Sequence, residues 1–240
     1  MALKNQQARV SIYVDGFNLY KGALQGNSHL KWLDIVKLAS LLAPEKLLVE
    51  AMYFTAEIAP TFTGDKAPDR QKLYLRALEI SGTTVVKGNF RVDPRWMPIH
   101  DQLLTTFTRP EAFSVKSKLA AAKVFTAAVG PAQTLVTKFE EKRSDVNLAS
   151  HLLRDVYESK ITHAIVVSGD TDLTTAIKFA SAAGCHVSVI IPSRHMESAS
   201  LQGVANYVSW LKSSTLGQCQ LGRVLVSPRG KPIIRPQEWS

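Results

Sequence analysis

The sequence has little cysteine and no long apolar run. Its 240 residues include only Cys185 and Cys219, which lie in unrelated segments with neither disulfide-framework nor zinc spacing. No uninterrupted apolar stretch approaches the ~20 residues of a transmembrane helix. The first residues lack the apolar core of a signal peptide. These absences predict a reduced cytoplasmic protein without membrane association.

Motifs of several common α/β enzyme classes are also missing. There is no GxxxxGK[ST] phosphate-binding loop, and no GxGxxG follows the first apolar strand, which argues against P-loop NTPases and dinucleotide-binding folds. The absence of GxSxG argues against an α/β-hydrolase. The six histidines show no metal-ligand spacing.

The net charge of +9 is concentrated in two segments. Residues 87–143 contain ten Lys and Arg against five Asp and Glu, residues 208–240 contain five against one, and the remaining residues balance. Such segments favour contact with a polyanion, and we expect Lys116, Lys118 and Lys123 to contact phosphates. The alternative is a solvated basic surface without a partner.

Short apolar runs alternate with helical stretches, a pattern typical of βαβ units and a parallel sheet. We therefore predict an α/β fold. Residues 91–132 interrupt the pattern and are predicted to be a basic insertion, and residues 211–240 an extended basic tail. Strands are predicted at 10–14, 47–54, 83–86, 133–139, 163–168 and 185–191, and helices at 33–42, 68–80, 144–159 and 173–183.

Acidic residues follow two of these strands. Asp15 ends the run Val10–Val14, and Asp170 and Asp172 follow Ala164–Val167. In open α/β sheets, ligands bind outside the carboxyl ends of the strands. Carboxylates crowded at one edge cannot all stay ionised without a cation nearby. The sequence therefore predicts a metal site at this edge.

Each candidate residue also has a plain structural interpretation. Asp145 resembles a carboxylate that favours a helix start, Asp172 an N-cap for the helix beginning at Leu173, and Asn18 a turn residue. Asp15 and Asp170 are not expected to cap a helix. Gly16 is expected to adopt an unusual backbone conformation or to allow close approach of a ligand.

The donor set indicates the metal and the reaction class. Carboxylate and amide oxygens without His or Cys suit Mg²⁺ or Mn²⁺ rather than zinc. Such ions activate water and stabilise a leaving oxygen in phosphodiester hydrolysis. The basic segments would then hold the nucleic acid.

Three motifs resemble those of the NYN domain family, which includes LabA-like proteins and is related to PIN-type nucleases. They are Tyr13–Tyr20, Lys142–Ala149 and Ile165–Leu173, within a predicted domain of residues 8–210. The resemblance implies a PIN-like three-layer α/β/α sandwich with a mostly parallel central sheet, and a metal-dependent ribonuclease, expected to cut RNA internally. It implies catalytic and metal-binding roles for Asp15, Asp145, Asp170 and Asp172, and substrate contacts by Asn18, Ser168, Thr171, Lys142 and Arg143.

Two other interpretations stay open from the sequence. The chain could be a non-catalytic nucleic-acid-binding or regulatory module that retains the acidic edge. A TOPRIM-like domain fits less well, because its first strand is expected to deliver Glu where Asp15 stands. Monomer and homodimer are both compatible with the sequence.

Overall fold

The computed structural model describes residues 7–60, 62–98, 133–194 and 199–239. Its centre is a six-stranded sheet in which every neighbouring pair runs parallel, with the order β3-β2-β1-β6-β7-β8. The predicted α/β class is confirmed. The strands are β1 (Arg9–Asp15), β2 (Leu47–Thr55), β3 (Thr83–Lys87), β6 (His163–Val167), β7 (His186–Ile191) and β8 (Tyr207–Trp210).

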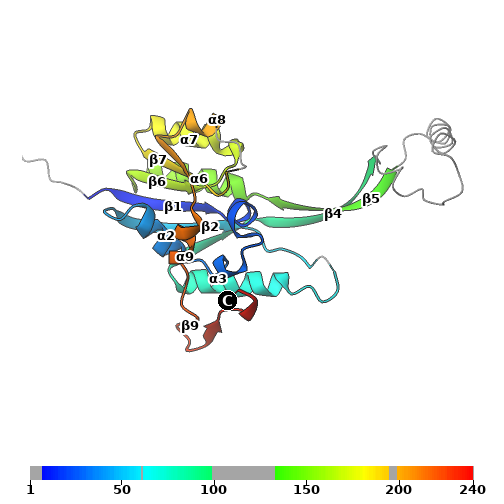
Figure 1. The fold of residues 1–240 in the computed structure, drawn as a ribbon. Coiled ribbons are helices and arrows are strands. Elements are labelled where there is room, and N and C mark those ends of the chain that lie inside the picture. The colour runs from blue at the N-terminus through cyan, green and yellow to red at the C-terminus, as the bar shows by residue number, and fades with distance from the viewer. Residues whose placement is uncertain (1–6, 61, 99–132, 195–198, 240) are drawn as a thin grey trace, which may run out of the picture. The chain divides into compact units, whose positions relative to one another are not determined.

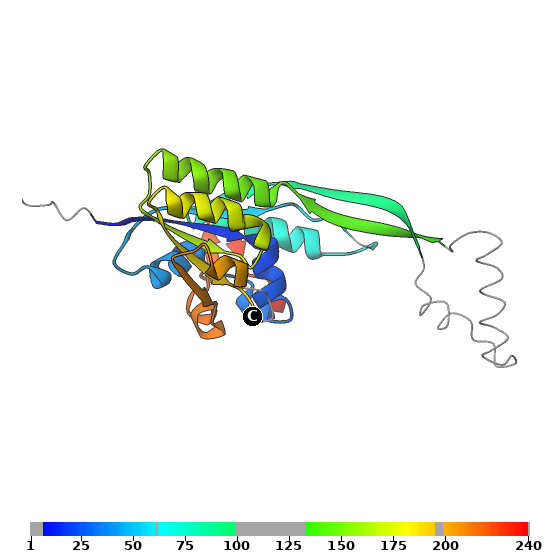
Figure 2. The ribbon, with the colours of Figure 1, turned by 90° about the horizontal axis from the view of Figure 1, so that it is seen from above.

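Helices cover both faces of this sheet and make a three-layer α/β/α arrangement (Figures 1 and 2). One face packs against α2 (Ile35–Leu42), α3 (Ala67–Ile80) and α9 (Ser213–Gln218). The other face packs against α6 (Ser144–Tyr157), α7 (Thr174–Ala182) and α8 (Ala199–Gln202). The sheet is therefore buried on both sides, as its unbroken apolar strands predict.

The β1 strand shows how the sequence divides between the two apolar layers. Val10, Ile12 and Val14 belong to the layer under α2 and α3, whereas Tyr13 belongs to the layer under α6 and α7. Successive strand residues point to opposite faces, so one short run supplies both layers. All four side chains are essentially inaccessible to solvent.

Residues 133–139 form a strand as predicted, but not in the main sheet. They belong to β5 (Gln133–Lys142), which pairs with β4 (Asn89–Pro98) in a separate two-stranded sheet. The chain divides into two compact units, and Arg91–Glu140 is one of them. The predicted insertion of residues 91–132 falls within this range, and its role stays a prediction.

Residues 211–239 differ from the predicted extended arm. They contribute α9, the antiparallel pair β9 (Val224–Val226) and β10 (Pro232–Ile234), and a 3₁₀ turn, η4 (Gln237–Trp239). Trp239 packs against Trp32 and Tyr74, with ring centroids 6.0 and 6.1 Å apart. Pro232 begins β10, and Pro228 and Pro236 lie between these elements, while Ile233 and Trp239 join the core.

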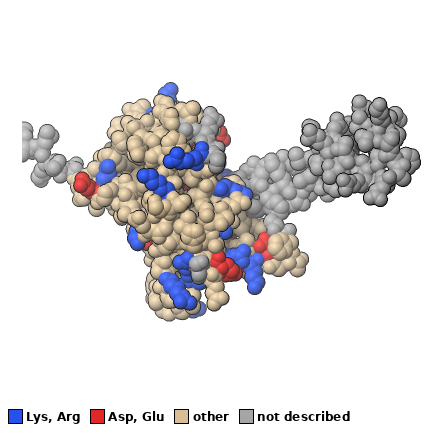
Figure 3. Space-filling model, in the orientation of Figure 1, with Lys and Arg blue, Asp and Glu red and all other residues tan. Residues whose placement is uncertain are grey.

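Basic side chains are scattered over the face of the molecule shown in Figure 3 and also gather at its lower end, around β9. This fits the excess of Lys and Arg that the sequence carries after residue 208. Within the described part of the chain, no helix is both long and apolar enough to cross a bilayer.

A buried polar pair joins β1 to α6 beneath the sheet. The Tyr13 hydroxyl donates a 2.9 Å hydrogen bond to Oδ2 of Asp155, whose side chain is almost wholly buried. The other carboxylate oxygen pairs with Arg154 at 2.7 Å and Lys160 at 3.6 Å. Burial and the neighbouring Asp155 raise the pKa of Tyr13 far above its ordinary value, so the phenol stays a donor.

Replacing Tyr13 with Phe should therefore destabilise the protein. The buried Asp155 carboxylate loses a donor, and the expected cost is about 1–3 kcal/mol in the free energy of unfolding. Urea denaturation of Tyr13→Phe measures this loss. The matched control is Tyr157→Phe, because Tyr157 is exposed. Equal stability of the two variants would show that the buried hydrogen bond contributes nothing.

Candidate metal centre

The candidate site lies where β1 and β6 pair in the middle of the sheet. From β1 the chain builds β2 and β3 to one side, and β6, β7 and β8 follow on the other side. Open α/β sheets bind ligands at the carboxyl ends of the two strands where the order reverses in this way. Asp15 ends β1, and Ser168 directly follows β6.

Three carboxylates converge at this edge. One oxygen of each of Asp15, Asp145 and Asp170 lies within 4.8 Å of the others. Ligands on opposite sides of an ion with bonds of about 2.1 Å would be about 4.2 Å apart, so small side-chain movements would let all three reach one Mg²⁺. Asp15 is buried, Asp170 is half-buried and Asp145 is exposed, which leaves one side of the group open to solvent.

Hydrogen bonds hold the buried member in place. Oδ1 of Asp15 accepts from the Asn18 amide at 2.9 Å, and Oδ2 accepts from the Ser168 hydroxyl at 3.0 Å. The same hydroxyl accepts from the Asp170 amide at 3.0 Å. Ser168 is itself buried, so it links the ends of β1 and β6 and orients both acids.

A second link runs through Asn18. Its Oδ1 accepts from the Gly169 amide at 2.8 Å and ties the turn after β1 to the loop after β6. Asn18 therefore positions the loop that carries Asp170. This contact does not exclude the predicted role of Asn18 in substrate binding, which stays a prediction.

The expectation that Asp15 and Asp170 cap no helix is wrong. Asp15 is the N-cap of α1 (Gly16–Leu19), and Asp170 is the N-cap of the 3₁₀ turn η3 (Thr171–Leu173), where it accepts from the Asp172 amide at 3.0 Å. Both carboxylates have several lone pairs, so one oxygen can accept from the backbone while the other faces the site. Asp172, the expected cap, lies instead within η3.

Helix α6 begins at Ser144, and its N-cap is Arg143, held in the left-handed region at φ 77°. This places Asp145 in the first turn, where the helix dipole favours a carboxylate. Asp145 therefore has the helix-start position that the sequence suggested and also belongs to the acidic group.

Electrostatic repulsion is evident at Asp145. Partial burial and the charges of Asp170 and Asp172 raise the pKa of its carboxyl above the usual range. Asp172 is exposed and lies outside the group of three, but it adds to the same negative field. A bound divalent cation would offset this repulsion.

The structure says less about the other residues that were predicted to contact the substrate. Thr171 and Arg143 are exposed beside members of the acidic group in the sequence. Lys142 ends β5. Lys116, Lys118 and Lys123 lie outside the described residues. Substrate contacts by these residues and by Ser168 stay predictions.

Tyr53 is a neighbour of the site that the sequence did not indicate. A Cβ on Gly16 would lie 2.6 Å from the phenol ring of Tyr53, so the glycine is needed for a close side-chain approach rather than for a ligand or a positive φ. The Tyr53 hydroxyl lies 3.5 Å from the Gly16 carbonyl. The sequence singled out Gly16, but only the pairing of β1 with β2 shows that Tyr53 lies next to it.

Residues 101–212 match the model of the NYN domain. This match confirms the resemblance to the NYN domain family that the sequence motifs indicate. The matched range includes Asp145, Asp170 and Asp172, whereas Asp15 and Asn18 lie before it, so the predicted boundaries of 8–210 stay a prediction. A match to the NYN domain points to the PIN-like nuclease superfamily.

Two further proteins resemble this chain. A curated protein of Pseudomonas putida (strain DSM 28022 / S16), named 6-hydroxy-3-succinoylpyridine 3-monooxygenase HspA, is 27% identical over 262 residues, covering 99% of this chain and 77% of its own length. A crystal structure of a protein of unknown function from Vibrio parahaemolyticus RIMD 2210633 is 15% identical, with a TM-score of 0.49, covering 88% of this chain and 98% of its own. That structural likeness is too low to carry a conclusion.

The acidic group predicts a metal-dependent change in stability. Mn²⁺ should raise the melting temperature of the wild type, because an ion that binds only the folded state stabilises it. Asp145→Asn should melt higher than the wild type without metal, since it removes one repelling charge, and should gain less from Mn²⁺. Differential scanning fluorimetry with and without Mn²⁺ measures both effects.

The matched control for this experiment is Glu45→Gln. Glu45 is exposed and precedes β2, so it lies at the amino end of that strand, away from the carboxyl edge. It should keep the full Mn²⁺ shift. The same shift in Asp145→Asn and Asp170→Asn as in the wild type would place the ion elsewhere.

Proposed function

We propose that this protein is a ribonuclease that uses Mg²⁺ or Mn²⁺ at Asp15, Asp145 and Asp170 to hydrolyse RNA phosphodiester bonds internally. The observation that carries the proposal is the convergence of these three carboxylates at the switch point of the sheet. The NYN match supports the same reaction class, because it points to the PIN-like nucleases. The basic composition fits a polyanionic substrate.

The donor set fits a hard divalent cation. Among the described residues, the acidic group offers only carboxylate oxygens as metal ligands. Such donors suit Mg²⁺ and Mn²⁺. When bound, such an ion polarises the phosphate and lowers the pKa of a water that can attack it. Mg²⁺ binds through few carboxylates and completes its shell with water and substrate phosphate, so an open, partly exposed group suits it.

The residues around the ion would have different roles. Asp15 is held from two sides by hydrogen bonds, which keeps one ligand rigid. Asp145 is exposed, so a substrate could reach it. Arg143, which is exposed and directly precedes α6, would contact a substrate phosphate, and Thr171 would offer its hydroxyl. Asp172 would act on the site through its charge.

A second candidate function follows from the curated relative. It matches nearly the whole chain, and its name describes oxygenation of a hydroxylated pyridine that carries an acidic side chain. The acidic group lacks the two histidines of the common non-haem iron site, and the sequence has no glycine-rich dinucleotide loop. Oxygen consumption with 6-hydroxy-3-succinoylpyridine and NADH distinguishes this activity from RNA cleavage.

Replacing single acids tests the ribonuclease directly. Asp15→Asn and Asp170→Asn should abolish Mn²⁺-dependent cleavage of a labelled single-stranded RNA, because Asn keeps the shape and removes the charge that holds the ion. Asn18→Ala should retain more activity. Circular dichroism checks folding, and Glu45→Gln should cut at the wild-type rate. Wild-type cleavage by Asp170→Asn would assign the activity to another site or to a contaminant.

The basic segment before residue 143 should contribute to RNA affinity through phosphates. Neutralising Lys116, Lys118 and Lys123 together should weaken binding to RNA of any sequence. It should also flatten the dependence of affinity on salt, because fewer counterions are released. Fluorescence anisotropy at several salt concentrations measures the slope. An unchanged slope would show that these lysines lie off the path of the RNA, and binding without cleavage by the wild type would favour a non-catalytic module.

A further inference from the structure

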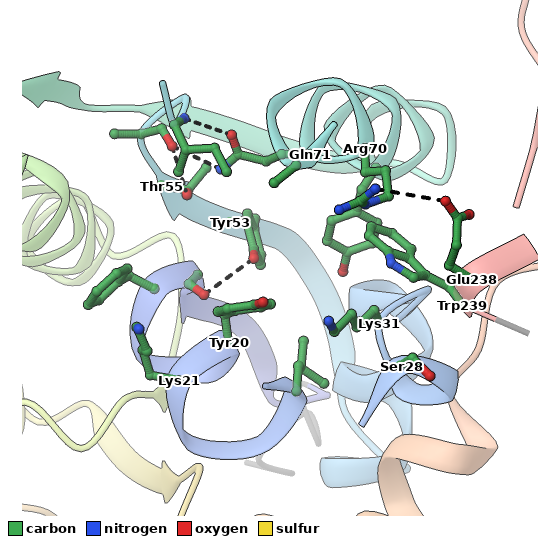
Figure 4. A pocket seen from close by; sticks show the side chains of 17 residues that line it. Tyr20, Lys21, Ser28, Lys31, Tyr53, Thr55, Arg70, Gln71, Glu238 and Trp239 are labelled. Atoms are coloured by element: carbon green, nitrogen blue, oxygen red, sulfur yellow. Dashed lines mark hydrogen bonds and ion pairs between the residues drawn. The ribbon is translucent and has the colours of Figure 1, made fainter. Parts of the chain in front are cut away.

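A second concave site opens beside the turn that follows β1. It is a cavity of about 440 Å³ bounded by α1, the π-helical segment η1 (Tyr20–Leu24), the end of β2, α3 and the C-terminal turn η4 (Figure 4). Cavities of roughly 300–1,000 Å³ are typical of small-molecule sites. The acidic group does not use this cavity, although Gly16, which lines it, directly follows Asp15.

Aromatic rings form much of its wall. Tyr53 and Tyr74 are buried and meet edge to face at 6.0 Å, Trp239 lies 6.1 Å from Tyr74, and Tyr20 stands at the more exposed side. The Tyr74 hydroxyl donates a 3.0 Å hydrogen bond to the Leu33 carbonyl, which fixes that ring. Rigid aromatic surfaces of this kind suit a planar ring, which can stack on them with little loss of conformational freedom.

Cations surround the same space. The Lys31 ammonium extends over the Tyr20 ring at 5.2 Å, and within the described chain it forms no ion pair with a carboxylate. Lys21 and Arg70 also line the cavity. Among the described lining residues Glu238 alone is acidic, and its contact with Arg70 is long, at 3.8 Å. The balance of charge therefore favours an anion.

We propose that this cavity binds a planar aromatic ring that carries an anionic group. The ring would lie among Tyr20, Tyr53 and Trp239, and the anionic group would face Lys31 and Arg70. Two sources share this chemistry, namely a nucleotide and a pyridine carboxylic acid. The proposal is independent of the proposed ribonuclease activity, because it needs neither a metal ion nor a cleavage step.

Isothermal titration calorimetry of the full chain in EDTA tests the proposal. One arm uses AMP and UMP, and the other uses 6-hydroxynicotinate. The neutral partners adenosine, uridine and 2-hydroxypyridine test the ring alone, and inorganic phosphate tests the anion alone. In one arm the anionic ligand should bind about tenfold tighter than its neutral partner, since a charge-assisted contact contributes at least this much. The arm in which this preference appears shows whether the ligand is a nucleotide or a pyridine carboxylic acid.

Variants locate the binding in the cavity. Lys31→Met should weaken binding about tenfold through loss of the cation. Gly16→Ala should weaken it too, because the new Cβ displaces the Tyr53 ring from its present position in the wall. Lys37→Met, which removes an exposed lysine of α2, is the matched control and should bind normally.

Asp170→Asn separates this proposal from the nuclease, since it should lose cleavage and keep full affinity for the small ligand. The proposal is overturned if no ligand binds in either arm, if phosphate alone binds as well as the aromatic anions, or if Lys31→Met and Gly16→Ala both bind like Lys37→Met. Thermal melting of each variant confirms that it is folded.

Discussion

The organisation of the site depends on the hydrogen bond from the Ser168 hydroxyl to Asp15 at the ends of β1 and β6. The two strands are more than 140 residues apart in the sequence, yet they are direct parallel neighbours in the sheet. Because Ser168 also accepts from the Asp170 amide, one buried hydroxyl sets the separation of two acids. Repulsion between those acids is thus opposed by the covalent and hydrogen-bonded frame around them.

The sequence predicted those features that a short stretch of residues determines. Val10–Val14 and Ala164–Val167 are apolar runs followed at once by acids, so both the strands and their acidic ends could be placed, and the structure brings Asp15 and Asp170 together. Asp145 was a weaker candidate, because its sequence context also suits an ordinary helix start.

The features that sequence reasoning missed depend on contacts between distant residues. Trp239 lies in a proline-containing stretch that suggests an extended arm, but its ring packs on Trp32, some 207 residues earlier. Likewise, β8 is too short to stand out from its flanking loop until it pairs with β7. Gly16 was expected to adopt an unusual backbone conformation or to admit a ligand, but it accommodates the side chain of Tyr53 from the neighbouring strand β2.

Trp239 and Glu238, in the C-terminal segment, form part of the wall of the cavity. The acids are supported by β1, β6 and α6, whereas part of the cavity wall belongs to a short turn that follows the last β-strand. Substitutions in that turn can alter the shape and charge of the cavity without disturbing the strands under Asp15 and Asp170. Ligand preference can therefore diverge between related chains, or be changed by engineering, while the acidic centre and the sheet beneath it remain the same.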